Sequence, residues 1–101
     1  MYVDARRDSP TFGAVVDVAL ELGTQVLVPH GVANGFQALV DGTQYAYCFD
    51  TEWQPGMPGL AFSPLDPLVA GRWPLAFDPD DRSLVSIKDF QAPSFDEVVQ
   101  R

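Results

Sequence analysis

Proline and glycine interrupt this chain at short and fairly regular intervals, with 9 Pro and 8 Gly among 101 residues. Proline cannot donate a hydrogen bond inside a helix, and glycine destabilises the middle of a helix or a strand. The apolar stretches between these residues are short. This pattern is typical of many short strands joined by turns, and it predicts an all-β chain.

The predicted strands cover residues 14–20, 25–28, 35–40 and 43–49, and Tyr2–Val3 resembles the end of a further strand. These segments are rich in β-branched and aromatic side chains, which fit a pleated and half-buried surface. They lie within a chain of 101 residues, which is enough for one small domain. We therefore expect a sandwich or a barrel of short strands.

Asp41–Gly42 separates the third and fourth predicted strands. A two-residue Asp-Gly loop between apolar segments is a strong hairpin signal. Side chains alternate along a strand, so one face of the fourth strand carries Thr43, Tyr45, Tyr47 and Phe49. The opposite face carries Gln44, Ala46 and Cys48. A buried and unreactive thiol is the expectation for Cys48.

The predicted helix lies at the end of the chain. Ser94 and Glu97 have the spacing of a capping box, and Pro93 comes just before them. A helix of about two turns is therefore expected over residues 94–100.

Charge and hydropathy exclude several classes of function. With 14 acidic and 6 basic side chains the net charge is -8, so the surface repels phosphate backbones and no nucleic-acid partner is expected. No apolar run reaches the roughly 18 residues of a membrane span. The first residues lack the apolar core of a secretion signal, which predicts a cytoplasmic protein. A single cysteine forms no internal disulfide.

Four motifs resemble the C-terminal half of the dTDP-4-dehydrorhamnose 3,5-epimerase family. They are DSPTFG at residues 8–13, VPHGVANGF at 28–36, YAY at 45–47 and IKDFQAP at 87–93. Each is weak alone, but their order and spacing fit the family along the whole chain. The resemblance implies a double-stranded β-helix of the cupin (jelly-roll) type. The whole chain, residues 1–101, would then be one partial epimerase-type domain, without the family's N-terminal strands and usually forming a homodimer.

The family inverts the carbons that flank the keto group of a dTDP-4-keto-6-deoxy sugar, in dTDP-rhamnose-type biosynthesis. It uses a histidine base held by an aspartate, and a tyrosine as the acid. The resemblance matches Tyr47 to the acid and Asp89 to the aspartate that orients the base. It implies no metal and no cofactor.

The resemblance also suggests substrate-binding residues. Lys88, the only lysine, matches a basic position beside the aspartate, and Trp53 stands where the family stacks an aromatic side chain on thymine. Asn34 replaces a histidine that contacts the substrate in many family members. The family's base histidine lies in the half not matched here. The sole histidine, His30, is in a different loop and is not assigned as the base.

Other interpretations remain open at this stage. Tyr47 also fits a half-buried structural aromatic, and Lys88 with Asp89 fits a solvated pair before the helix. At the level of function, the alternatives to a catalytic epimerase are a non-catalytic nucleotide-sugar-binding module and a dimerising remnant that lacks the base histidine. Half of a β-roll exposes strand edges, which favours association with another chain.

Overall fold

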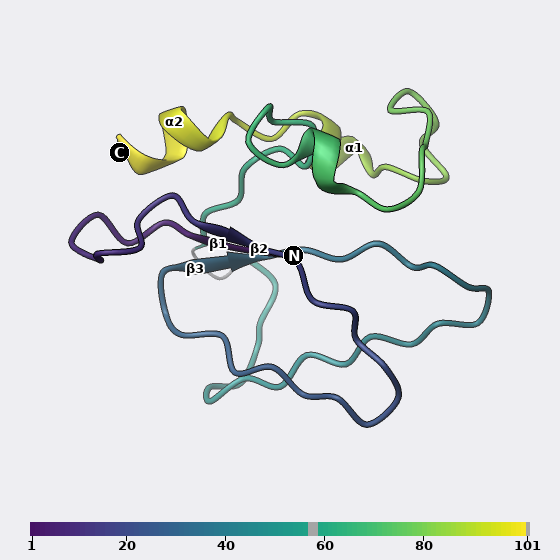
Figure 1. The fold of residues 1–101 in the computed structure, drawn as a ribbon, viewed down its shortest axis with the longest axis horizontal. Coiled ribbons are helices and arrows are strands. Elements are labelled where there is room, and N and C mark those ends of the chain that lie inside the picture. The colour runs from purple at the N-terminus through teal and green to yellow at the C-terminus, as the bar shows by residue number, and fades with distance from the viewer. Residues whose placement is uncertain (57–58, 101) are drawn as a thin grey trace.

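The computed structural model describes residues 1–56 and 59–100. A three-stranded antiparallel sheet lies at its centre, with β1 (Tyr2–Asp4) between β2 (Val15–Val16) and β3 (Val32–Asn34) (Figure 1). In the register of this sheet, Tyr2 of β1 faces Val16 on one side and Asn34 on the other. The predicted strand at Tyr2–Val3 is therefore confirmed, and it is the central strand.

Three short helical segments follow in the second half of the chain: the 3-10 helix η1 (Ala70–Arg72), α1 (Ile87–Phe90) and α2 (Phe95–Val99). The Ser94 side chain accepts a hydrogen bond from the Glu97 backbone, and the Glu97 side chain accepts one from the Ser94 backbone. This capping box satisfies two amides that the first turn of α2 leaves without partners. The predicted terminal helix is thus confirmed.

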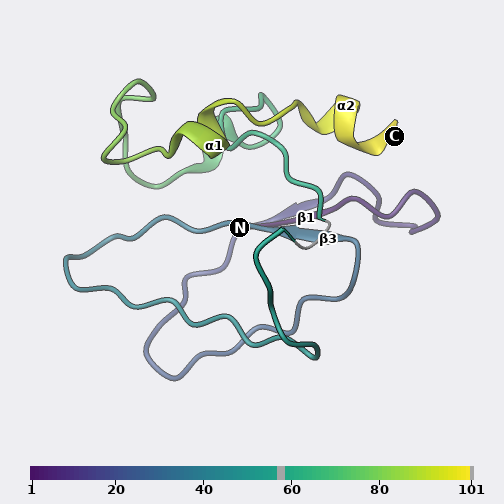
Figure 2. The same ribbon diagram turned by 180° about the vertical axis from the view of Figure 1, so that it is seen from behind.

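The helical half covers one face of the sheet, as Figures 1 and 2 show from opposite sides. A small core joins the two layers, formed by Val3 from β1, Val69 before η1 and Phe95 from α2. Phe62 packs edge-on against Phe95, with ring centroids 5.2 Å apart. The two long connections, residues 17–31 and 35–50, extend away from this core (Figure 1).

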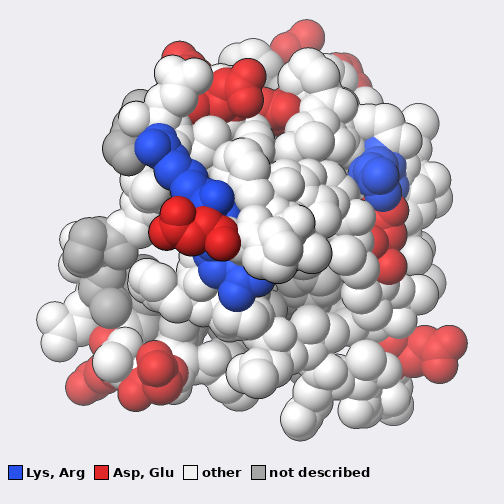
Figure 3. Space-filling view, turned by 60° about the vertical axis from the view of Figure 1, so that its left-hand side comes forward, with Lys and Arg blue, Asp and Glu red and all other residues white. Residues whose placement is uncertain are grey.

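Charged groups are spread unevenly over the surface. On the face shown in Figure 3, the basic groups of the described residues lie in two places, each beside acidic groups, and further acidic groups are scattered near the rim. Ion pairs join Arg6 to Asp4 and Arg72 to Asp17. Among residues 1–56 and 59–100, the basic groups on this face form no continuous patch (Figure 3).

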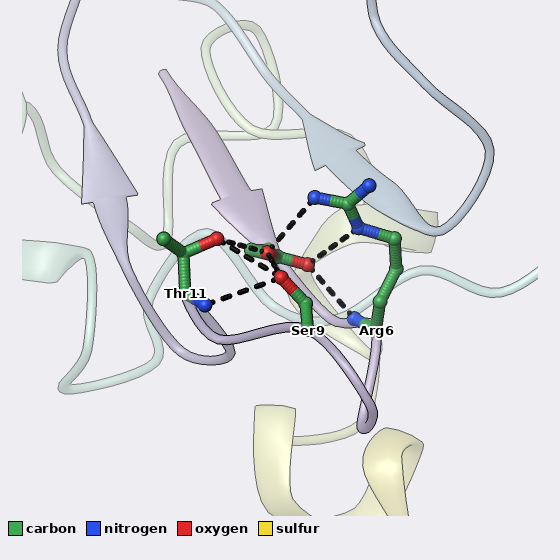
Figure 4. A network of polar contacts seen from close by, with 4 residues as sticks. Arg6, Ser9 and Thr11 are labelled. Atoms are coloured by element: carbon green, nitrogen blue, oxygen red, sulfur yellow. Dashed lines mark hydrogen bonds and ion pairs between the residues drawn. The ribbon is translucent and has the colours of Figure 1, made fainter.

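Asp4 ends β1 and organises the turn that leads to β2 (Figure 4). Its carboxylate accepts hydrogen bonds from Arg6 Nε at 2.9 Å and Nη2 at 3.0 Å, and from the hydroxyls of Ser9 and Thr11 at 2.6 Å each. The Asp4 residue is 6% exposed. These donors, with Arg6 first, hold the pKa of the Asp4 carboxyl well below its usual range. The network closes the turn through which the chain returns to the sheet.

Most of the predicted strands beyond β1 are wrong in extent. Residues 14–20 contribute only Val15–Val16, and residues 25–28, 35–40 and 43–49 form no strand. The Asp41–Gly42 turn is nevertheless present, with a φ of +77° at Gly42 that favours glycine. The segments before and after the turn, residues 35–40 and 43–49, contact each other through side chains and not through backbone hydrogen bonds. A two-stranded hairpin is marginal without a third strand or a covering layer.

Two further expectations are corrected. Cys48 is exposed and not buried, because its arm packs against no layer on that side. Residues 87–90 form helix α1, which the sequence analysis did not predict, so the chain is not purely β. The hydroxyl of Ser86 accepts a hydrogen bond from the Asp89 backbone and caps this helix.

Candidate functional site

An aromatic row runs along the segment that follows the Asp41–Gly42 turn. The Tyr45 and Tyr47 ring centroids are 4.8 Å apart at an interplanar angle of 60°, and those of Tyr47 and Phe49 are 6.2 Å apart. Phe36, from the arm before the turn, stacks on Tyr45 with centroids 4.1 Å apart. The predicted shared face of Tyr45, Tyr47 and Phe49 is therefore confirmed, although no strand is formed.

Tyr2 connects this row to the sheet. It lies on β1 and is 8% exposed. Burial, a hydrogen bond to Tyr45, and the charges that Tyr45 and Tyr47 carry when ionised raise the pKa of Tyr2 to about 12. All three tyrosines of the chain thus gather in one cluster.

Tyr47 stands at the open side of the cluster and is 53% exposed. Partial burial raises the pKa of its phenol, and the charges of Tyr45 and Asp89 raise it further. A phenol is protonated at neutral pH, as a proton donor must be, and the raised pKa of Tyr47 leaves that state unchanged. The influence of Asp89 also places that carboxylate within electrostatic range of Tyr47.

Asp89 reaches this position from helix α1, in the opposite half of the chain. Its backbone is held by the Ser86 cap at 3.1 Å. Within residues 1–56 and 59–100 its exposed carboxylate has no hydrogen-bond or ion-pair partner. Tyr47 and Asp89, which lie 42 positions apart in the sequence, thus influence each other electrostatically, since the charge of Asp89 helps raise the pKa of Tyr47.

Lys88 precedes Asp89 on α1 and is exposed. It lines an open hollow of about 240 Å³ whose remaining wall is small and apolar. That wall consists of Gly59, Leu60, Ala61, Ala92 and Pro93. A cation at the edge of an apolar hollow can pair with an anionic group of a ligand. Lys88 and Asp89 are both exposed and precede the terminal helix α2, as in the interpretation of a solvated pair, but they belong to the short helix α1.

The other two predicted site residues, Trp53 and Asn34, have no described contact with Tyr47 or Asp89. Trp53 is 61% exposed and lies four positions after Phe49. Asn34 ends β3 opposite Tyr2 and exposes its side chain. None of the described contacts joins Trp53, Asn34 or Lys88 to Tyr47.

The sequence analysis missed Tyr2 and Tyr45 as members of the site. The strand alternation places Tyr45 beside Tyr47, so the signal for Tyr45 was present. Tyr2 carries no comparable signal, because its approach to Tyr45 depends on how β1 meets the 43–49 segment.

Neither a metal site nor a membrane segment emerges from the described part of the chain. Among residues 1–56 and 59–100, no three histidine, cysteine, aspartate or glutamate side chains group closely enough to hold a metal ion. The helices within the same residues are all too short to cross a membrane.

Comparison with known proteins agrees with these motifs. The chain matches the profile of the family described as dTDP-4-dehydrorhamnose 3,5-epimerase over residues 1–97. It is 38% identical over 98 residues to the dTDP-4-dehydrorhamnose 3,5-epimerase of Mycobacterium tuberculosis. The aligned residues cover 95% of this chain and 47% of the relative. It is 32% identical over 99 residues to the protein of the same name from Salmonella typhimurium, covering 96% of this chain and 51% of the relative.

The chain therefore spans about half the length of the curated relatives that it matches. No solved structure gave a significant match. The family profile nevertheless covers nearly all of the sequence, including each motif identified above. This protein belongs to the dTDP-4-dehydrorhamnose 3,5-epimerase family.

Proposed function

We propose that this chain forms part of an epimerase acting on a dTDP-4-keto-6-deoxy sugar, with Tyr47 as the proton donor and Asp89 as the residue that orients the base. The base is a histidine carried by the half of the family that this chain does not match. Lys88, Trp53 and Asn34 contact the substrate. Membership of the family supports the substrate class.

The reaction needs a base and an acid on opposite faces of the sugar. The base removes a proton from a carbon beside the ketone, and the electron pair moves to the keto oxygen as an enolate. The enolate carbon then takes a proton from the other face, so the configuration inverts and no atom is lost. Such a donor must be protonated before the step and must reach the open side of the ring.

The observation that supports the proposal is the electrostatic influence of Asp89 on the Tyr47 phenol. Tyr47 has a raised pKa and is half-exposed, and the charge of Asp89 contributes to that raised pKa. In this proposal the Asp89 carboxylate, which has no ion-pair partner among the described residues, holds the base imidazole by one ring N–H. The two groups would then flank the reacting carbon.

The scaffold and the assembly belong to the same proposal. We infer that the three-stranded sheet is part of a cupin-type β-roll, a single domain whose remaining strands complete the pairing of the 14–28 and 35–49 arms. Large apolar side chains are exposed on both arms, among them Leu22, Leu27, Val40 and Phe49. Their exposure supports association with further polypeptide, including a homodimer. A cytoplasmic location fits an enzyme of nucleotide-sugar metabolism.

Deuterium exchange tests the proposal. The chain is incubated in heavy water with dTDP-4-keto-6-deoxyglucose, alone and with a separately produced N-terminal half of the Mycobacterium tuberculosis relative. We expect deuterium beside the keto group only in the mixture, because only the mixture holds both a base and its aspartate. Absence of exchange in both samples contradicts the catalytic role. Calorimetric binding of dTDP without exchange would instead identify a binding module.

A further inference from the structure

We propose that Tyr45 is a positioning residue for Tyr47: its ring, stacked on Phe36, holds the Tyr47 ring in the orientation that donates a proton. This inference rests on the proposed function, since it presumes that Tyr47 is the acid. It goes further because Tyr2 lies outside the four motifs, and the resemblance gives no role to Tyr45, the first residue of the YAY motif.

The geometry gives Tyr45 three supports. Its ring lies nearly parallel to that of Phe36, at 4.1 Å and an interplanar angle of 4°. Its edge-to-face contact with Tyr47 spans 4.8 Å at 60°, an arrangement that aromatic quadrupoles favour. Its phenol also interacts with that of Tyr2 on β1, and this interaction helps to raise the pKa of Tyr2.

Tyr47 needs such support because it lies on a segment without strand hydrogen bonds. More than half of its surface is open to solvent, so packing alone leaves its ring poorly constrained. A small misplacement of a reacting group lowers a rate strongly, by up to about 100-fold for about 1 Å. The contact with Tyr45 joins Tyr47 to the cluster of rings that reaches the sheet through Tyr2.

Kinetics of the mixture of halves tests the inference through three variants. Tyr45→Leu removes the ring, and inversion should fall about 10- to 100-fold with KM and deuterium exchange retained. Tyr45→Phe and Tyr2→Phe each remove only the Tyr2–Tyr45 hydrogen bond, so each should lower inversion by no more than about tenfold. The double variant should invert the substrate no more slowly than either single variant, because both substitutions remove the same hydrogen bond.

Equal inversion in wild type and Tyr45→Leu overturns the inference. A parallel loss of exchange and inversion in Tyr45→Leu also overturns it, because it indicates damage to the whole site. A strictly additive double Phe variant shows that Tyr2 and Tyr45 act independently.

Tyrosine NMR separates this inference from the proposed function, because it needs no activity. With ring carbons labelled, the chain gives signals from only three tyrosines, all in the cluster. Tyr45→Phe should lower the pKa of both Tyr2 and Tyr47, since the opposing phenolate is gone. Nuclear Overhauser contacts between the rings of residues 45 and 47 should persist in Tyr45→Phe. Missing ring contacts in the wild-type chain overturn the positioning role, even if the mixture of halves is active.

Discussion

Replacing Tyr47 with Phe should abolish inversion while leaving deuterium exchange in place. The base and its aspartate still remove the proton and return it on the same face, so exchange continues without a change of configuration. Loss of the opposed donor should lower inversion about 10²- to 10⁴-fold, the usual contribution of a positioned acid. The measurement compares deuterium content with product configuration, by NMR, in the mixture of halves.

Thr43→Val is the matched control for that substitution. It removes a hydroxyl from the same segment, where Thr43 Oγ1 donates to the Val40 carbonyl at 2.7 Å. Exchange and inversion should both stay near the wild-type rates. Equal losses of exchange and inversion in Tyr47→Phe would show that Tyr47 is not the donor on the opposite face.

The second large effect is expected at Asp4. In Asp4→Asn, an amide NH₂ meets the donors Arg6, Ser9 and Thr11, and the Arg6 charge loses its partner. We expect the melting temperature to fall by more than about 10 °C, since the network closes the turn between the two first strands. The exposed pair of Arg72 and Asp17 supplies the control: Asp17→Asn should lower Tm by less than about 5 °C.

The pH dependence of this effect has a definite sign. The folded-state pKa of Asp4 lies below the unfolded value of about 3.9, so the stabilisation is present above that value and lost as pH falls below it. The difference in Tm between wild type and Asp4→Asn should therefore shrink steadily from about pH 5 to about pH 2. If the difference in Tm stays constant over that range, the charge of Asp4 does not contribute to the stabilisation.

Sequence reasoning succeeded where the interaction is local. The Ser94–Glu97 capping box and the Asp41–Gly42 turn depend on residues within a few positions of each other, and both are present. The alternation that aligned Tyr45 with Tyr47 is local as well. The Ser86 cap of α1 also joins residues three positions apart, so this helix start could have been predicted from the sequence as well.

Features that depend on distant contacts were predicted less well. The arms around Asp41–Gly42 have strand-like composition, but strand formation requires a neighbour that supplies ladder hydrogen bonds. The exposure of Cys48 follows from the same unpaired arm. For the site, the resemblance suggested Tyr47 and Asp89, whereas the contribution of Tyr2 depends on the approach of β1 and could not be read from spacing.

The account depends most on the proximity of the Tyr47 phenol to the Asp89 carboxylate, and Asp89→Asn tests it directly. Tyrosine NMR over a pH titration should show a lower pKa of Tyr47 in this variant, because a negative charge that opposes ionisation is removed. The pKa of Tyr2 should not change, and Asp96→Asn on α2 should leave both tyrosines as they are in the wild type. An unchanged Tyr47 titration in Asp89→Asn would show that the two groups lie far apart, and it would contradict the proposed site.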